Sequence, residues 1–135
     1  EDAARTLLQQ AVTNNPEDPG AHFALGLSHV RAAAPEEAFA EIEAAAMLAP
    51  DTPYYQYVIG IALNSNGDRD AAIEKLTQVH ERFPGYRNAL LALATIHRDG
   101  GDITEAAVYA RRLLALSPSD SVAQRLLNEV TAATP

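Results

Sequence analysis

The feature that most constrains this chain is a period of 34 residues that runs through most of its length. Two series of small residues and one series of prolines keep this step: Gly26, Gly60 and Ala94; Ala38, Ala72 and Ala106; and Pro16, Pro50, Pro84 and Pro118. A fixed period of this size is the signature of an array in which each unit buries its apolar face against its neighbours. The sequence therefore predicts a stack of similar units.

Each period contains two stretches with apolar residues at helical spacing, joined by a short turn. In residues 53–84 the first stretch includes Val58 and Ile59, and the second includes Ile73 and Leu76. This pattern predicts an all-α chain of antiparallel helix pairs. The expected organisation is a lone second helix in residues 1–18, three helix pairs in residues 19–52, 53–86 and 87–120, and a capping helix in residues 121–135.

The turns between paired helices carry recognisable local signals. Glycine occurs at Gly67 and at Gly100-Gly101, whereas the turn at residues 32–35 has alanine instead and ends in Pro35. Asp68 is expected to cap the helix that follows it. Asp102 and Glu105 have the spacing of a capping box.

The two terminal segments differ in character. In residues 1–15 an apolar face, which includes Ala4, Leu7, Leu8 and Ala11, has no first helix to pair with, so it is predicted to be uncovered. In the last helix, apolar residues such as Leu126 are expected to cover the third pair. The opposite side of this helix is polar and consists of Gln124, Arg125, Asn128, Glu129 and Thr131.

The residues at the pattern positions resemble those of the tetratricopeptide repeat family. The three repeats supply, in order, His22, Leu25, Gly26, His29, Ala38, Ile42, Ala45 and Pro50; Gln56, Ile59, Gly60, Leu63, Ala72, Leu76, Val79 and Pro84; and Leu90, Leu93, Ala94, His97, Ala106, Ala110, Leu113 and Pro118. The resemblance implies a right-handed α–α superhelix.

In such an array the first helix of each pair lines the concave side, and helical phase selects the residues that face it. The expected partner-binding residues are Phe23, Leu27, Val30, Arg31, Tyr54, Tyr57, Ile61, Asn64, Ser65, Asn88, Leu91, Thr95, Arg98 and Asp99, with Arg125 and Glu129 from the last helix. Their apolar members predict one patch that binds a protein or a peptide, because contiguous exposed apolar surface marks interaction sites. Some members of the family bind an acidic C-terminal tail through a carboxylate clamp of Lys, Asn and Arg side chains. This chain has none of the five clamp residues, because the matching positions hold Phe23, Leu27, Val58, Asn88 and Ala92.

Composition excludes several other classes of partner. A net charge of −8 argues against nucleic acid and against anionic membranes, both of which require basic surface. No apolar run is long enough to insert in a bilayer, and we identify no signal peptide. The lack of cysteine suits the bacterial cytoplasm and the periplasm equally. Nine arginines beside one lysine favour a GC-rich bacterial source, and the start at Glu1 without methionine suggests an excised module.

The sequence contains no pattern typical of an enzyme, a metal site or a cofactor site. Acidic residues gather at Asp68, Asp70 and Glu74 and again at Asp102 and Glu105, where helix starts account for them. His22, His29 and His97 lack metal-ligand spacing, so we expect His29 and His97 to fill space between helices. His80 is expected at the surface.

Two further hypotheses belong to other functional classes. The uncovered face of residues 1–15 suggests a module that forms homodimers. The run from Tyr55 to Ser65 is also similar to repeat modules that follow multihaem c-type cytochrome domains, which would make the chain an accessory segment of a larger bacterial enzyme. No C-x-x-C-H motif is present, so any haem would lie outside this chain.

Overall fold

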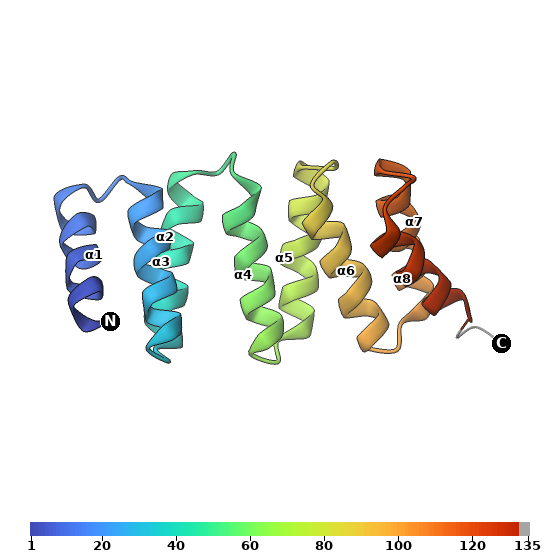
Figure 1. The fold of residues 1–135 in the computed structure, drawn as a ribbon, viewed down its shortest axis with the longest axis horizontal. Helices are drawn as coiled ribbons and strands as arrows, with labels where there is room; N and C mark the ends of the chain where they lie inside the picture. Colours follow the sequence, from blue (N-terminus) through green and yellow to red (C-terminus); the bar gives the residue numbers. More distant parts are fainter. Residues whose placement is uncertain (133–135) are drawn as a thin grey trace. The chain divides into compact units, whose positions relative to one another are not determined.

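The computed structural model describes residues 1–132, which form α-helices and no β-strand (Figure 1). The helices are α1 (Asp2–Asn14), α2 (Pro19–Arg31), α3 (Pro35–Leu48), α4 (Pro53–Ser65), α5 (Arg69–Arg82), α6 (Arg87–Asp99), α7 (Ile103–Leu116) and α8 (Ser121–Ala132). The prediction of an all-α repeat array is confirmed. None of the described helices combines the length and the apolar character that crossing a bilayer requires.

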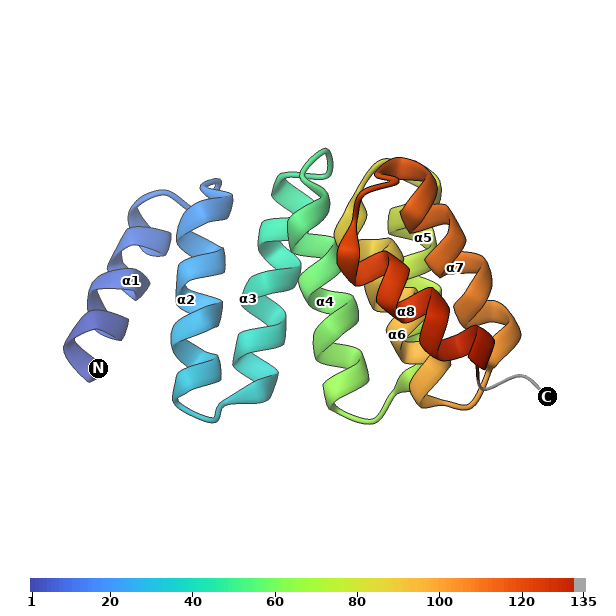
Figure 2. The same ribbon diagram turned by 45° about the vertical axis from the view of Figure 1, so that its right-hand side comes forward.

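The chain divides into two compact units, residues 1–62 and residues 63–135, with the boundary inside α4. In the first unit, α1, α2 and α3 lie side by side in alternating directions (Figures 1 and 2). In the second unit, α6 and α7 form an antiparallel pair, α5 packs against α6, and α8 contacts both α6 and α7.

Local sequence explains where the helices begin. Pro19 and Pro35 occupy first-turn positions, where the missing N–H of proline costs nothing. Asp18 accepts hydrogen bonds from the backbone N–H groups of Gly20 and Ala21, at 2.8 and 3.3 Å. Asp68 accepts one from Ala71 at 3.3 Å, so its predicted cap is confirmed.

The capping box predicted at Asp102 and Glu105 is wrong. Asp102 precedes α7 but makes no capping hydrogen bond with its side chain. Its Oδ2 instead lies 3.2 Å from Nδ1 of His97 in α6. The carboxylate therefore links the two helices across the turn.

Helices α2 and α3 approach closely at Gly26. A Cβ atom placed on Gly26 would lie 2.7 Å from Cγ1 of Ile42 and 3.2 Å from the carbonyl oxygen of Ala38. The equivalent residues of the second unit, Ala94 in α6 and Ala106 in α7, are fully buried. In these two helix pairs, the small residues of both series lie where the paired helices meet, as the period predicts.

Helix α8 has the two-sided character expected of a capping helix. Ala123, Leu126 and Val130 are buried, in keeping with the packing of α8 on α6 and α7. Gln124 and Asn128 are exposed and hydrogen-bonded to each other at 3.0 Å. Its polar side therefore stays in solvent.

The turns inside the three helix pairs share one backbone geometry. Ala33, Gly67 and Gly101 stand one period apart, and all three have positive φ angles of 57°, 86° and 82°. In each turn the next residue donates its N–H to the carbonyl five residues earlier, for example from Ala34 to His29 at 3.0 Å. This bond is the Schellman closure of a helix C-terminus. The first turn keeps the geometry although it lacks glycine.

Replacing Ala33 with glycine should stabilise the protein. An L-residue in the left-handed region costs about 1–2 kcal/mol, and glycine avoids this cost. We expect Ala33→Gly to raise the free energy of unfolding by about 1 kcal/mol in chemical denaturation. The control is Ala32→Gly, because Ala32 has φ −85° and gains nothing. Equal or opposite effects at the two positions would contradict the strain at Ala33.

Candidate functional site

An aromatic cluster lies on the first helices of the first unit. It consists of Phe23 in α2 and Tyr54, Tyr55 and Tyr57 in α4. The ring centroid of Phe23 lies 5.5 Å from that of Tyr54, edge to face, and 5.0 Å from that of Tyr55. Tyr57 lies 6.2 Å from Tyr54. Tyr54 is 45% exposed, so part of the cluster is open to solvent.

The other residues predicted for this face have different surroundings. Leu27 and Val30 are exposed by 37% and 57%, one and two turns beyond Phe23 on α2. Ile61 of α4 is half-buried. Arg31 is exposed, but its Nε donates to Oε1 of Glu1 at 3.0 Å and so ties α2 to the start of α1. This hydrogen bond lowers the pKa of Glu1.

In the second unit, predicted partner-binding residues surround a cavity between α6 and α8, of about 70 Å³. Its lining residues are Leu91, Thr95, Arg98, Val122, Arg125, Leu126 and Glu129. Five of them were predicted from helical phase. Val122 and Leu126 were not predicted to line this surface. The period could have identified them, since they lie 34 residues after Asn88 and Ala92 of α6.

Charges on this cavity are partly paired. Arg98 donates from Nε to Oδ1 of Asp99 at 3.1 Å and from Nη1 to Oε2 of Glu129 at 2.9 Å. The hydrogen bond to Asp99 raises the pKa of Arg98, burial opposes this rise, and the hydrogen bond to Glu129 adds to it, so the pKa is raised overall. Arg125 is exposed at the rim. The cavity thus offers apolar contact beside a cation held in place by two carboxylates.

An ion pair outside the cavity fixes α8 against α6. Asp120 caps α8 by accepting from the N–H groups of Val122 and Ala123, at 3.0 and 3.1 Å. It also accepts from Nε and Nη2 of Arg87, at 2.7 and 3.2 Å. The hydrogen bond from Arg87, with help from the Ala123 amide, lowers the pKa of Asp120 to about 2. The carboxylate is therefore ionised across the physiological range.

The remaining predicted residues belong neither to the aromatic cluster nor to the lining of the cavity between α6 and α8. Asn64 and Ser65 are exposed at the end of α4, and Asp99 is exposed at the end of α6. Asn88 is half-buried and donates from Nδ2 to the hydroxyl oxygen of Tyr86 at 3.4 Å. Tyr55 belongs to the aromatic cluster although it was not among the predicted partner-binding residues.

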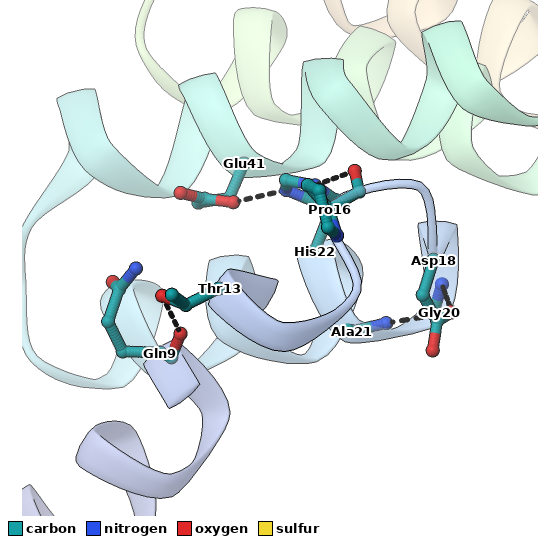
Figure 3. A network of polar contacts seen from close by, with 8 residues as sticks. All are labelled: Gln9, Thr13, Pro16, Asp18, Gly20, Ala21, His22 and Glu41. Atoms are coloured by element: carbon teal, nitrogen blue, oxygen red, sulfur yellow. Dashed lines mark hydrogen bonds and ion pairs between the residues drawn. The ribbon is translucent and has the colours of Figure 1, made fainter. Parts of the chain in front are cut away.

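His22 connects three segments of the first unit (Figure 3). Its Nδ1 lies 2.6 Å from Oε2 of Glu41 in α3, and its Nε2 lies 2.9 Å from the carbonyl oxygen of Pro16. Both partners are hydrogen-bond acceptors, so the protonated ring, with an N–H on each nitrogen, satisfies both contacts. Burial lowers the pKa of His22, but the bonds to Glu41 and Pro16 outweigh it and the pKa is raised.

His97 fills space between helices, whereas the prediction for His80 is wrong. His97 is buried and stacks on Tyr109 of α7, with centroids 5.6 Å apart, as expected for a filler. His80 was predicted at the surface but is half-buried, edge-on to the same Tyr109 ring at 6.2 Å. Burial, and then the charge of Arg112, lowers the pKa of His80. In the described residues no three His, Cys, Asp or Glu side chains gather in a group that could hold a metal ion.

Helix α1 exposes positions that the repeat buries elsewhere. Ala4 and Ala11 are exposed, Leu8 is half-buried, and Leu7 is 66% exposed. One period after Ala4, Leu8 and Ala11, the corresponding residues of α3 are all buried: Ala38, Ile42 and Ala45. The difference arises because α3 has α2 as its own first helix, whereas no described helix takes that place for α1.

The charge on His22 makes its contribution to stability depend on pH. A raised pKa gives a contribution that is complete below the unfolded value of about 6.5 and is lost as the pH rises through the folded value. We therefore expect His22→Gln to lower the free energy of unfolding by about 1–2 kcal/mol near pH 6 and by less near pH 9. Urea denaturation over this range measures the difference.

The matched control is His80→Gln, whose effect should have the opposite pH dependence. Because the pKa of His80 is lowered, the wild type loses stability relative to this variant as the pH falls through about 6.5. A pH-independent effect of His22→Gln, or an NMR titration that places the His22 pKa below the ordinary value, would contradict the assignment.

Comparisons with known proteins agree with this fold. A model of the tetratricopeptide repeat family matches residues 2–54 and 57–121. A crystal structure of MamA superposes with a TM-score of 0.81 at 17% identity, covering 98% of this chain and 77% of MamA. YrrB, a TPR protein with an unusual peptide-binding site, gives 0.74 at 19% identity, covering 90% of this chain and 63% of YrrB.

A chain of the APC/C hetero-tetramer Cut9–Hcn1 gives a TM-score of 0.76 at 22% identity, with coverage of 91% of this chain and 25% of that one. At these identities the similarity describes the fold alone. A search of curated protein sequences finds no match.

Proposed function

Because this chain belongs to the tetratricopeptide repeat family, we propose that it is a non-catalytic scaffold that binds a protein or peptide through the side of its first helices that the sequence predicts to line a concave groove. The observation that carries the proposal is the aromatic cluster, with Tyr54 exposed and with Leu27 and Val30 exposed along the same side of α2. Tyrosines are favoured anchors in interfaces, because one ring offers both contact area and a hydroxyl group.

The cavity between α6 and α8 supports the same role for the second unit. Its apolar wall of Leu91, Val122 and Leu126 is bordered by Arg98, Arg125 and Glu129. A volume of about 70 Å³ is too small for a cofactor but can receive a side chain of a partner. A partner could thus combine apolar contact with hydrogen bonds to fixed charges.

The acidic residues at helix starts have structural roles that need no catalysis. Asp68 caps α5 and Asp102 binds His97, so two of the carboxylates at helix starts are already engaged in structural contacts. Among the structural neighbours, YrrB is a peptide-binding protein and the Cut9–Hcn1 chain is part of a hetero-tetramer. These neighbours make binding of a peptide or protein a reasonable role for the same fold here.

Site-directed cross-linking tests the proposal. A photoreactive amino acid at Tyr54 or at Leu91, in the protein expressed in its source organism, should trap the same partner, whereas one at Met47 should not. Met47 is 78% exposed on α3 and serves as the control position. With the purified partner, Tyr54→Ala and Leu91→Ala should each weaken binding about tenfold, without loss of helicity, and Met47→Ala should not. Unchanged affinity in both variants would place the binding site elsewhere.

A second candidate function is self-association through α1. The observation that favours it is the uncovered apolar side of α1, where Leu7 is 66% exposed and Ala4 and Ala11 are open to solvent. In a dimer formed through these faces, each copy would bury the α1 positions whose equivalents in α3 are already buried within the chain. Such an isologous contact would give a symmetric dimer.

Sedimentation velocity at increasing protein concentration tests the dimer. The wild type should shift toward a dimer, and Leu7→Glu should remain a monomer because a buried carboxylate without a partner is costly. Met47→Glu, which adds the same charge at an exposed site of α3, should associate like the wild type. A wild-type protein that stays monomeric at all concentrations would exclude this function.

A further inference from the structure

We propose that the cavity between α6 and α8 binds a partner segment that carries an aliphatic and an acidic side chain two residues apart. The aliphatic side chain enters the cavity, and the acidic one pairs with Arg125 at the rim. The inference rests on the proposed function, which it sharpens by naming the chemistry of the ligand. It follows from the apolar wall of the cavity, from the ion pairs that hold its two helices, and from the surroundings of Arg125.

One face of each helix lines the cavity. The lining residues are Leu91, Thr95 and Arg98 on α6, and Val122, Arg125, Leu126 and Glu129 on α8. Residues three and four positions apart are neighbours on a helix surface, so each helix presents a single stripe. Leu91, Val122 and Leu126 supply only hydrocarbon side chains to it. A volume of about 70 Å³ is room for about five to seven water-sized groups, at about 10–15 Å³ each. That space suits the side chain of Val, Leu or Ile but not the ring system of Trp.

Ion pairs hold the two helices together near both ends of the cavity. Arg87 at the start of α6 binds Asp120, the residue before α8, at 2.7 Å. Arg98 near the end of α6 binds Glu129 of α8 at 2.9 Å. A site whose walls are fixed before binding loses little conformational entropy when a ligand arrives. The cavity is therefore preformed, and a partner side chain can enter it without first separating the helices.

Arg125 is the cation at this cavity that a partner can use. It is exposed, and within residues 1–132 it forms no ion pair or hydrogen bond with another side chain. Glu129 lies four residues further along α8, where arginine and glutamate can pair, but its Oε2 accepts from Arg98 at 2.9 Å. Arg98 also donates to Asp99 at 3.1 Å. The guanidinium of Arg98 is thus occupied by carboxylates of the chain, whereas that of Arg125 is open.

The distribution of charge makes the second unit the better place for an acidic ligand. Residues 1–62 contain nine acidic and two basic residues, a net charge of −7. Residues 63–135 contain nine acidic and eight basic residues, a net charge of −1. A carboxylate is therefore repelled less by the second unit than by the first. At the cavity, the carboxylates of Asp99 and Glu129 are both bound to Arg98, so the remaining positive charge is at Arg125.

An extended segment can reach the apolar wall and Arg125 together. Leu126 is buried and Arg125 is exposed, so the cation lies outside the apolar wall. In an extended chain, alternate side chains are on the same side and about 6.5 Å apart. An aliphatic and an acidic side chain two residues apart therefore match the two features. A C-terminal carboxylate shares its Cα atom with the last side chain, so it lacks this separation, and we assign the carboxylate to a side chain.

A titration with designed peptides tests the proposal on the full chain. The probe is a short peptide, blocked at both ends, with one leucine and one glutamate two residues apart among serines. The comparison peptides have glutamine or lysine in place of the glutamate. In ¹⁵N NMR, the glutamate peptide should shift the amide signals of Leu91, Thr95 and Leu126. It should bind about twofold to fivefold more tightly than the glutamine peptide, because an exposed ion pair is weak, and the lysine peptide should bind least tightly.

Two substitutions separate a contact with Arg125 from general electrostatic attraction. Arg125→Gln should bind the glutamate and glutamine peptides with equal affinity, because the partner of the carboxylate is gone. Arg111→Gln is the matched control, since Arg111 is exposed on α7 and its loss changes the net charge by the same amount. This control should keep the preference for the glutamate peptide. Circular dichroism checks that both variants retain their helices.

Two further peptides test the fit of the cavity and the source of the carboxylate. Tryptophan in place of the leucine should weaken binding about threefold or more, because the indole ring exceeds the space between α6 and α8. A peptide without glutamate that ends in leucine with a free C-terminal carboxylate should bind no more tightly than the blocked glutamine peptide.

Several outcomes would overturn the proposal. If the wild type binds the glutamine peptide as tightly as the glutamate peptide, or binds neither, the cavity does not select a carboxylate. If Arg125→Gln keeps the preference for glutamate, another cation provides the contact. Tighter binding of the peptide with the free C-terminus would mean that a chain end is the ligand. Failure of the scaffold function itself would appear separately, as the absence of a cross-linked partner at both Tyr54 and Leu91.

Discussion

The close contact between α2 and α3, and between α6 and α7, is the constraint on which the rest of each unit depends. At Gly26 the backbone of α2 leaves room for Ile42 and for the Ala38 carbonyl, and an added side chain there would cost about 1–3 kcal/mol through overpacking. Because paired helices meet through small residues, their larger side chains point toward neighbouring helices or into solvent. That division determines which residues are available to form the aromatic cluster and the α6–α8 cavity.

Much of the fold could be predicted from sequence because its signals are local and repeated. The period located each helix pair, proline located the starts of α2 and α3, and Asp68 was recognised as a cap. Side-chain partners across a turn could not be predicted in the same way. Asp102 has the spacing of a cap, yet His97 lies close enough to take its carboxylate. The backbone conformation of the first turn could not be predicted either, because Ala33 has a positive φ angle, which is usually found at glycine.

The candidate site was predicted less completely than the fold. Helical phase identified Leu91, Thr95 and Arg98, which the structure brings together around one cavity with Arg125 and Glu129. Phase alone could not reveal that Tyr55 joins the rings of Phe23 and Tyr54, since that depends on the distance between α2 and α4. Nor could it reveal that Arg31 is engaged by Glu1, because an ion pair between helices depends on their packing.

The unlike chemistry of α1 and α8 bears on how the chain can be enlarged by design. Residues of α1 such as Ala4 and Ala11 are small, apolar and uncovered, so a further hairpin grafted ahead of them would meet a surface already suited to it. The outward side of α8 holds Gln124 and Asn128 in a mutual hydrogen bond, and covering this pair would strand polar atoms away from water. Modular extension of this scaffold is therefore directional: repeats can be added before α1 with the present sequence, whereas growth beyond α8 first requires its polar side to be rewritten.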